Sequence, residues 1–197
     1  MKCYTIIGGV SGVGKSSLSG ILRSEVDNFG KLIDSENLNL ICDDMISDCV
    51  SAEMLIEDCL DKGICFAQES TLADCRTAET AKTASELGYC VRLYYVGLNT
   101  LEESLKRIEN RVAKGGRNVS AEIVAKQFNT RFSDVKAVLP YCKEATFYDN
   151  ENGFKTVAKY VNGKLDFTGE VTPNWMASLS EYLNLSSETE DEYDVSN

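Results

Sequence analysis

The chain has 197 residues, of which 43% are hydrophobic and 26% are charged, a composition typical of one folded domain with its own core. Its net charge of −11 argues against a general nucleic-acid binder or a protein that docks on anionic membranes, because both need a basic surface. Since the chain has no histidine, a Ser-His-Asp triad, a Cys-His dyad and a His-ligated metal are excluded. Any acid–base step must therefore use a carboxylate, Lys, Tyr or Cys.

The first 150 residues alternate between strand-like and helix-like segments. Apolar runs at 2–7, 38–42, 64–68, 89–96 and 145–148 predict buried strands. Apolar residues at helical spacing predict helices at 15–26, 52–60, 77–87, 101–113 and 121–138. This alternation predicts an α/β fold, with a mostly parallel five-stranded sheet covered by helices on both faces.

The last 50 residues predict a small appendage and a tail. Two strand-like runs, 154–161 and 164–167, flank Asn162-Gly163, a dipeptide typical of a two-residue hairpin turn. A short helix is expected at 173–183. Residues 186–197 hold five acidic residues and no basic one, which predicts a disordered tail. We therefore expect a single domain over 1–185 and an acidic disordered tail over 186–197.

The eight cysteines and the N-terminus indicate the compartment. The cysteines are scattered without a CxxC pair, which favours small buried hydrophobes in a reducing environment over a zinc site or a disulfide framework. The first apolar run is too short for a signal peptide. No run approaches the ~20 apolar residues of a membrane span. We expect a cytoplasmic protein.

The strongest motif is Gly9-Val10-Ser11-Gly12-Val13-Gly14-Lys15-Ser16, which matches the phosphate-loop pattern G-x-x-x-x-G-K-[ST] between an apolar strand and a helix. Its glycines let the backbone approach an anion closely, and amides at the start of the helix point at that anion. Lys15 is expected to neutralise the β- and γ-phosphates, and the Ser16 hydroxyl to ligate Mg²⁺. The motif predicts a nucleoside triphosphate and magnesium without choosing between kinase, GTPase and motor. The residues assigned to the nucleotide are Ser11, Gly12, Val13, Gly14, Lys15, Ser16 and Ser17.

Acidic residues follow two of the predicted strands. Asp43-Asp44 follow 38–42, and Glu69-Ser70-Thr71 follow 64–68. In open α/β sheets the ligand lies beyond the carboxyl ends of the strands. One carboxylate there can deprotonate an acceptor hydroxyl, while another holds magnesium or binds the acceptor. The alternative is that Asp43 or Asp44 only caps the helix that follows.

A basic segment at 105–136 contrasts with the acidic remainder of the chain. It carries eight Lys or Arg against three Asp or Glu. Arg107 and Arg111 are four residues apart, so they share one helix face and can neutralise charge on a transferred phosphate. Gly115-Gly116 can hinge a lid formed by 101–138. An ordinary solvated helix face is the alternative interpretation.

Taken in order, these pieces resemble the zeta-toxin-like P-loop kinases over about residues 3–150. Characterised members of that family phosphorylate a sugar hydroxyl of UDP-N-acetylglucosamine. The residues that carry the resemblance are the loop at 9–17, Asp43-Asp44, Glu69-Ser70-Thr71, Val96-Gly97-Leu98, Arg107-x-x-x-Arg111-Val112, Gly115-Gly116-Arg117, and Tyr148-Asp149-Asn150.

The resemblance implies a role for each matching residue. Asp43 is implied as the general base, and Arg107 and Arg111 as the groups that stabilise transfer, with Lys15 completing the catalytic set. Asp44, Glu69 and Thr71 are implied near the acceptor or the metal, and Asn150 near the adenine. The chain departs from the family where Arg117 replaces a frequent His, where Lys126-Gln127 replace a frequent Arg, and where Asp44 replaces a frequent Glu.

The sequence therefore predicts an ATP-dependent kinase that transfers the γ-phosphate to a hydroxyl of a small molecule. The resemblance makes a UDP-N-acetylamino sugar the candidate acceptor and an antitoxin protein a candidate partner. Neither nucleic acid nor a membrane is expected as a partner. Two alternatives remain open, namely a metabolic kinase with a different acceptor and a regulatory P-loop ATPase switch.

Overall fold

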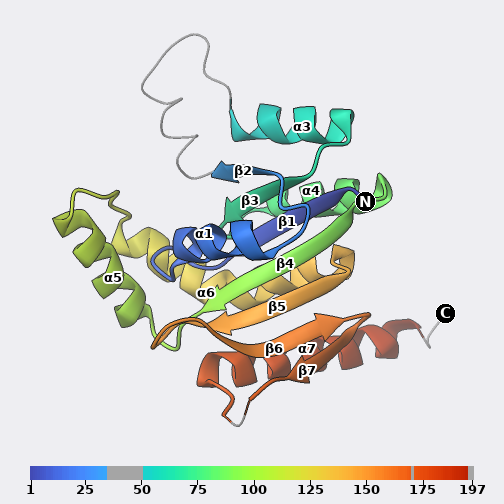
Figure 1. The fold of residues 1–197 in the computed structure, drawn as a ribbon. Helices are drawn as coiled ribbons and strands as arrows, with labels where there is room; N and C mark the ends of the chain where they lie inside the picture. The colour runs from blue at the N-terminus through green and yellow to red at the C-terminus, as the bar shows by residue number, and fades with distance from the viewer. Residues whose placement is uncertain (35–50, 170, 195–197) are drawn as a thin grey trace.

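A computed structural model describes residues 1–34, 51–169 and 171–194, with side chains described up to residue 184 (Figure 1). Its centre is one seven-stranded sheet in the order β2-β3-β1-β4-β5-β6-β7. The first five strands pair in parallel and the last two antiparallel. The strands are β1 Cys3–Gly8, β2 Lys31–Asp34, β3 Phe66–Ser70, β4 Cys90–Gly97, β5 Glu144–Asp149, β6 Lys155–Val161 and β7 Lys164–Phe167.

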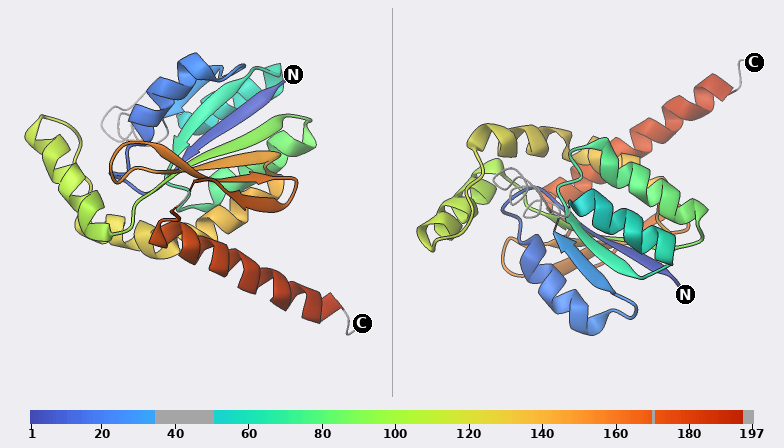
Figure 2. Two further views of the ribbon diagram at one scale, coloured as in Figure 1. Left: turned by 60° about the horizontal axis from the view of Figure 1, so that its bottom comes forward. Right: turned by 90° about the horizontal axis from the view of Figure 1, so that it is seen from above.

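Helices cover both faces of this sheet (Figures 1 and 2). One face packs against α1 (Lys15–Glu25), α5 (Leu101–Ala113) and the start of α6 (Ala121–Val138). The other face packs against α3 (Ala52–Lys62), α4 (Cys75–Glu86), the end of α6 and α7 (Asn174–Asp194). Both views in Figure 2 show α5 and α7 projecting beyond the body of the sheet.

The strand β3, which lies between β2 and β1, is buried on both faces, as expected for a parallel sheet between two helical layers. Its side chains alternate between the layers. Phe66 packs with the α3 and α4 side, while Ala67 packs with the α1 side. By the same alternation the Glu69 side chain points toward α1, where it accepts a hydrogen bond from Ser16. The Ser70 side chain points toward α4, where it shares a hydrogen bond with Thr77.

The predicted α/β fold with a mostly parallel sheet is confirmed, but the number of strands is wrong: the sheet has seven strands, not five. The hairpin β6–β7 is not a separate appendage, because β6 pairs with β5 and extends the same sheet. An edge strand carries unpaired N–H and C=O groups, and the hairpin satisfies those of β5. The predicted turn is confirmed, with Asn162 and Gly163 both at positive φ.

At the opposite edge the sheet contains a strand that the sequence pattern did not indicate. β2 has only Leu32 and Ile33 between two charged residues, a run too short to stand out. It is aligned by pairing with β3, in the register Asp34↔Glu69. The strand predicted at 38–42 lies outside the described residues.

The helices follow the predictions closely, with one difference at the C-terminus. α5 and α6 have the predicted bounds, 101–113 and 121–138. α7 runs to Asp194, whereas the sequence predicts a helix ending at 183 and a disordered tail from 186. Glutamate is a good helix former, so the acidic residues that follow the packed part of α7 can continue the same helix. Among the described residues no helix is long and apolar enough to cross a membrane.

Several cysteines behave as the predicted buried hydrophobes. Cys3, Cys59 and Cys142 are buried thiols. Burial raises the pKa of each of these thiols, and that of Cys142 reaches about 12. They therefore stay protonated at neutral pH and pack as small apolar side chains.

Candidate active site

A cavity of about 340 Å³ lies at the carboxyl end of the sheet, where the phosphate loop, two strand ends and the α5 segment meet. We call it the phosphate cavity. Its floor is the loop that follows β1, with Lys15 at the start of α1. Its carboxylates lie at the ends of β2 and β3, and its three arginines come from α5 and the turn after it. The lining residues are Ser11, Gly12, Gly14, Lys15, Ser16, Ser17, Asp34, Glu69, Arg107, Arg111 and Arg117.

The loop backbone requires glycine, as Gly12 and Gly14 illustrate. Gly12 has φ 89°, and a Cβ there would lie 2.5 Å from the Ser104 carbonyl oxygen. Gly14 has φ 105°, and a Cβ there would lie 2.6 Å from Asn150 Nδ2. Gly14 is also the N-cap of α1 and provides no side-chain cap. The first amides of α1 are therefore available to an anion in the cavity, where the helix dipole adds to the attraction.

Lys15 lies folded over the loop from which it emerges. Its side chain is buried, and Nζ donates hydrogen bonds to the carbonyl oxygens of Gly9, at 2.9 Å, and of Val10, at 3.4 Å. These two carbonyls hold the ammonium group beside the loop, and Lys15 lines the phosphate cavity. A positive charge in this place is suited to phosphate oxygens.

Glu69 forms the acidic side of the cavity. It is 4% exposed, and its carboxylate accepts hydrogen bonds from Ser16 Oγ at 2.7 Å and from Ser19 Oγ at 2.6 Å. The register Asp34↔Glu69 brings a second carboxylate to the same level on the neighbouring strand. Hydroxyl and carboxylate oxygens are the donors that Mg²⁺ prefers, so Ser16 and Glu69 fit the predicted metal.

Arg107 ties α5 to the chain that follows β5. Its Nε donates to Glu103 at 3.0 Å, and its Nη2 donates to the Asn150 carbonyl oxygen at 2.6 Å. Arg107 also lines the phosphate cavity. Arg107 thus joins the nucleotide side of the site to the first helix of the predicted lid.

The turn after α5 folds around Arg111. The Gly116 amide donates to the Arg111 carbonyl at 2.9 Å, and Arg111 Nε donates to the Arg117 carbonyl at 2.9 Å. A Cβ at Gly116 would lie 2.5 Å from Arg111 Cγ, so this approach requires glycine. The turn brings Arg117 to the same cavity as Arg111.

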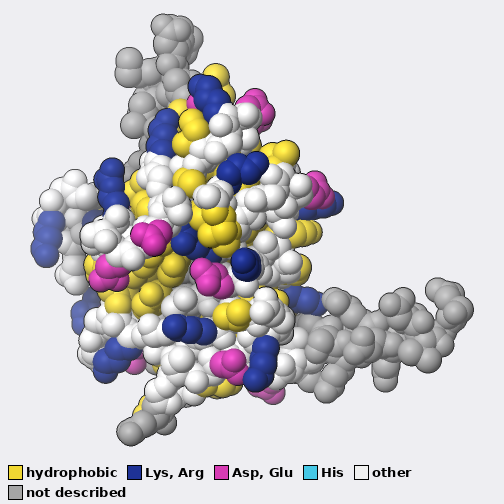
Figure 3. Space-filling model, turned by 45° about the vertical axis from the view of Figure 1, so that its right-hand side comes forward, with side chains coloured by type: hydrophobic (Ala, Val, Ile, Leu, Met, Phe, Trp, Pro, Cys, Tyr) yellow, Lys and Arg dark blue, Asp and Glu magenta, His cyan; other side chains and the backbone are white. Residues whose placement is uncertain are grey.

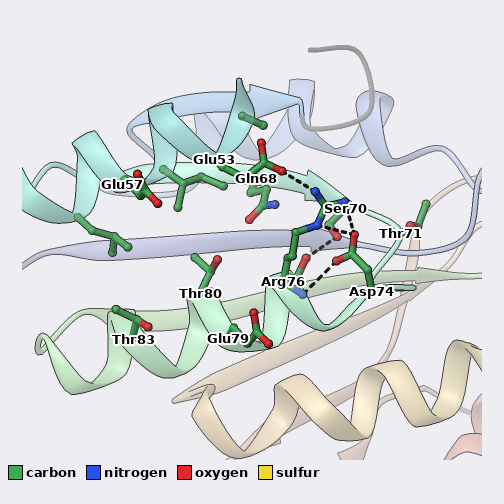
Figure 4. Close-up of a pocket in the computed structure, with 14 residues that line it drawn as sticks. Glu53, Glu57, Gln68, Ser70, Thr71, Asp74, Arg76, Glu79, Thr80 and Thr83 are labelled. Carbon is green, nitrogen blue, oxygen red and sulfur yellow. Dashed lines mark hydrogen bonds and ion pairs between the residues drawn. The ribbon is translucent and has the colours of Figure 1, made fainter. Parts of the chain in front are cut away.

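A second cavity of about 410 Å³, which we call the α3–α4 groove, opens on the other face of β3 (Figure 4). Buried Gln68, Ser70 and Thr77 belong to its lining. Arg76 spans the two helices, with Nη1 at 2.6 Å from Glu53 and Nη2 at 2.7 Å from Asp74 (Figure 4). Hydroxyl and acidic side chains make up most of the remaining polar lining, namely Glu57, Thr71, Glu79, Thr80 and Thr83.

Acidic side chains outnumber basic ones in the α3–α4 groove. A backbone hydrogen bond at the start of α3, with further help from Ser51 and Arg76, lowers the pKa of Glu53. Asp74 and Glu53 raise the pKa of Arg76. Four carboxylates thus face one guanidinium. Such a lining disfavours a phosphate group and suits an uncharged polar ligand.

The structure brings most predicted site residues together and separates one. Val13 is buried, but its carbonyl oxygen accepts a hydrogen bond from Asn150 Nδ2 at 2.8 Å, which places Asn150 against the phosphate loop. Thr71 lies in the α3–α4 groove instead of the phosphate cavity. Asp43 and Asp44 lie outside the described residues. The other predicted residues line the phosphate cavity, namely Ser11, Gly12, Gly14, Lys15, Ser16, Ser17, Glu69, Arg107 and Arg111.

Two cavity residues were not among the predicted site residues. Asp34 ends β2, and the signal for it was the short Leu32-Ile33 run followed by an acid. Arg117 belongs to the predicted basic segment and to the motif that carries the family resemblance, but no site role was assigned to it. Both enter the cavity through contacts that depend on the tertiary structure.

Comparison with known proteins supplies a family. A family model described as "Zeta toxin" matches residues 48–154, more than half of the chain and entirely beyond the phosphate loop. The chain belongs to the zeta toxin family. The predicted resemblance to zeta-toxin-like P-loop kinases is thereby confirmed. An uncharacterized protein of Haemophilus influenzae is 32% identical over 122 residues, which cover 59% of this chain and 85% of that protein.

Solved structures share the fold of this zeta toxin family member. The PezAT toxin–antitoxin system of Streptococcus pneumoniae contains a chain with a TM-score of 0.60 at 16% identity, over 98% of this chain and 87% of that one. The AvrRxo1-ORF1:AvrRxo1-ORF2 complex with ATP contains another, with a TM-score of 0.60 at 14% identity, over 93% of this chain. This chain spans 63% of that second protein. At these identities the likeness is one of fold.

The loop geometry generates a prediction with a matched control. Replacing Gly14 by Ala forces a Cβ against Asn150 and strains a positive-φ position, so the free energy of unfolding should fall by about 1–3 kcal/mol. Gly20, six residues further along in α1, has nothing within 4 Å of an added Cβ. Gly20→Ala should leave stability unchanged or raise it by about 1 kcal/mol. Urea unfolding followed by circular dichroism measures both. Equal effects of the two substitutions would contradict the strained geometry of Gly14.

Proposed function

We propose that the chain is an ATP-dependent phosphotransferase that transfers the γ-phosphate to a hydroxyl of a small molecule. The observation that carries the proposal is the phosphate cavity, which combines a phosphate loop, two strand-end carboxylates and three arginines. Family membership supports it, as does the structurally similar AvrRxo1 complex solved with ATP. A protein that uses ATP in this way belongs in the cytoplasm, which we propose as its location.

In the proposed reaction, the loop and its basic neighbours hold the triphosphate. The amides at the start of α1 and the Lys15 ammonium bind the β- and γ-phosphates. Arg111 and Arg117 face the same cavity and neutralise the charge on the transferred group. Ser16 and Glu69 hold Mg²⁺, which when bound adds positive charge beside the phosphates. We assign the adenine to the side of Asn150, as the family resemblance implies, and the hydrogen bond from Asn150 to the loop supports this assignment.

With no histidine in the chain, we propose a carboxylate as the general base, since two carboxylates line the cavity. Glu69 is engaged by two serine hydroxyls, which suits it to the metal side of the site. Asp34 lines the same cavity from the neighbouring strand, and we propose it as a candidate base. Asp43, with Asp44 beside it, stays the base predicted from the sequence.

The α3–α4 groove is the proposed place for the part of the acceptor that does not react. It lies at the same strand end as the phosphate cavity, since Glu69 belongs to one and Ser70 and Thr71 to the other. Its hydroxyls and carboxylates suit the hydroxyl or amide groups of a sugar or a nucleobase. A UDP-N-acetylamino sugar fits if its diphosphate stays near the arginines. The likeness to a chain of the PezAT system supports an antitoxin as a candidate partner.

Lys15→Ala tests the phosphate-cavity assignment. Losing one positioned cation should lower the rate of phosphoryl transfer by about 10²–10³-fold, equivalent to ~2–4 kcal/mol. Lys164→Ala is the control, because Lys164 is exposed on the hairpin and pairs with Asp166. The purified protein is incubated with Mg²⁺, ATP and candidate UDP-sugars, and ADP and phosphorylated acceptor are quantified. Unchanged turnover in Lys15→Ala would overturn the assignment, and ADP without a phosphorylated acceptor would favour the ATPase switch.

Substitution of the two candidate carboxylates identifies the base. We expect Asp34→Asn to lower kcat by about 10²–10⁴-fold, since the amide keeps the size of the side chain but cannot take a proton. Asp43→Asn is measured in parallel under the same saturating ATP and acceptor concentrations. A large loss of kcat in Asp43→Asn alone would assign the base to Asp43 and contradict the role of Asp34.

Filling the groove tests where the acceptor binds. Thr80→Trp, which places a large side chain in the α3–α4 groove, should raise the KM for the acceptor at least about tenfold and leave the KM for ATP unchanged. Lys82→Trp is the control, because Lys82 is exposed on the same helix and does not line the groove. Equal acceptor KM values in both variants would show that the acceptor binds elsewhere.

A further inference from the structure

The first turn of α7 inserts an aromatic ring at the carboxyl ends of β4 and β5. Trp175 is 3% exposed and is the single tryptophan of the chain. Its ring packs against Tyr95, with centroids 5.9 Å apart, and lies flat against the backbone of Gly97, where a Cβ would meet the indole at 2.4 Å. Its backbone N–H donates to Asn99 Oδ1 at 3.2 Å. The start of α7 is therefore fixed at the strand ends that border the phosphate loop.

The indole N–H completes the environment of a buried carboxylate. Trp175 Nε1 donates to Asp149 Oδ1 at 2.9 Å, and the Glu151 amide donates to Asp149 Oδ2 at 3.2 Å. Asp149 is only 8% exposed, so each donor matters. Losing one of these donors would leave a buried carboxylate oxygen without a hydrogen bond, which is energetically costly and favours a rearrangement around Asp149.

The residue between these two contacts reaches the phosphate loop. Asn150 donates through its backbone N–H to the Gly97 carbonyl at 3.3 Å and through Nδ2 to the Val13 carbonyl at 2.8 Å. Its own carbonyl accepts from Arg107 of α5 at 2.6 Å. Residues 149–151 thus connect α7 on one side with the phosphate loop and α5 on the other. Because Asp149 and Asn150 are adjacent, a backbone shift that follows the loss of a donor to Asp149 would also move Asn150.

We propose that Trp175 is a positioning residue for the nucleotide, acting through Asp149 and Asn150 on the phosphate loop. The inference rests on the proposed function. According to this inference, α7 helps to hold the phosphate loop in the conformation that binds ATP, although α7 lies beyond the segment matched by the family model. Trp175 does not touch the reacting atoms, so its effect belongs to nucleotide binding and not to the chemical step.

Trp175→Phe in the full chain is the first test. Phenylalanine keeps an aromatic ring in the core but removes the donor to Asp149, so the KM for ATP should rise about tenfold while kcat stays within about twofold. Tyr182→Phe, on the same helix, is the control: the ring that contacts Phe132 is kept, and both parameters should stay at the wild-type values. An unchanged KM for ATP in a folded Trp175→Phe protein overturns the inference.

The fluorescence of Trp175 gives a readout that a merely structural role would not move. ATP with Mg²⁺ should change the emission of the wild-type protein, and the change should be lost in Asn150→Ala even at ATP concentrations that saturate binding by calorimetry. A wild-type emission that does not respond, although calorimetry shows ATP binding, overturns the inference. Absence of ATP binding in the wild-type protein overturns the proposed function instead.

A second variant covers the case in which Trp175→Phe does not fold. Asp149→Asn keeps the side-chain size but can no longer accept from both Trp175 and Glu151. It should raise the KM for ATP in the same direction, with kcat again close to wild type. A KM equal to that of the wild type contradicts the inference as directly as the tryptophan variant would.

Discussion

The parallel pairing of β3 with β1 is the constraint on which the site depends. The register Ile7↔Glu69 and Gly8↔Ser70 places the end of β3 beside the point where β1 becomes the phosphate loop. Glu69 can then accept hydrogen bonds from Ser16 and Ser19, which lie on the helix that follows the loop. A shift of this register by one residue would turn Glu69 toward the opposite helical layer and remove the carboxylate from the cavity.

The same strand separates two chemical environments. Alternation along β3 sends Glu69 to the layer of α1, while Gln68 and Ser70 face the layer of α3 and α4. One side becomes a cavity with cationic groups for phosphates, and the other becomes an acidic groove rich in hydroxyls. The two cavities border adjacent residues at one strand end, and the proposal that one acceptor places a charged part in one and an uncharged part in the other rests on this closeness.

The chain is acidic overall, but basic side chains are concentrated at the phosphate cavity. The three arginines of the site come from α5 and the turn after it, and Lys15 comes from the start of α1, in a chain whose overall charge is −11. Elsewhere the charges are mixed: on the face shown in Figure 3, Lys and Arg side chains are interspersed with Asp and Glu. The local field at the cavity, and not the net charge, decides whether a small anion binds.

Some features could be predicted from the sequence because they are local. The phosphate loop, the helices at 101–113 and 121–138, and the turn at Asn162-Gly163 each depend on residues within a few positions of one another, where glycine conformation and side-chain spacing set the backbone. The parallel α/β class follows in the same way from alternating apolar runs.

Other features were decided only by the tertiary structure. Asp34 enters the phosphate cavity because a two-residue apolar run pairs with β3. Thr71 lies in the α3–α4 groove because β3 ends at Ser70, so the alternation of the strand does not extend to the loop residue after it. The contact between Trp175 and Asp149 joins residues from the last helix and the fifth strand. Such contacts depend on register and packing between segments far apart in the chain, which local pattern and propensity do not specify.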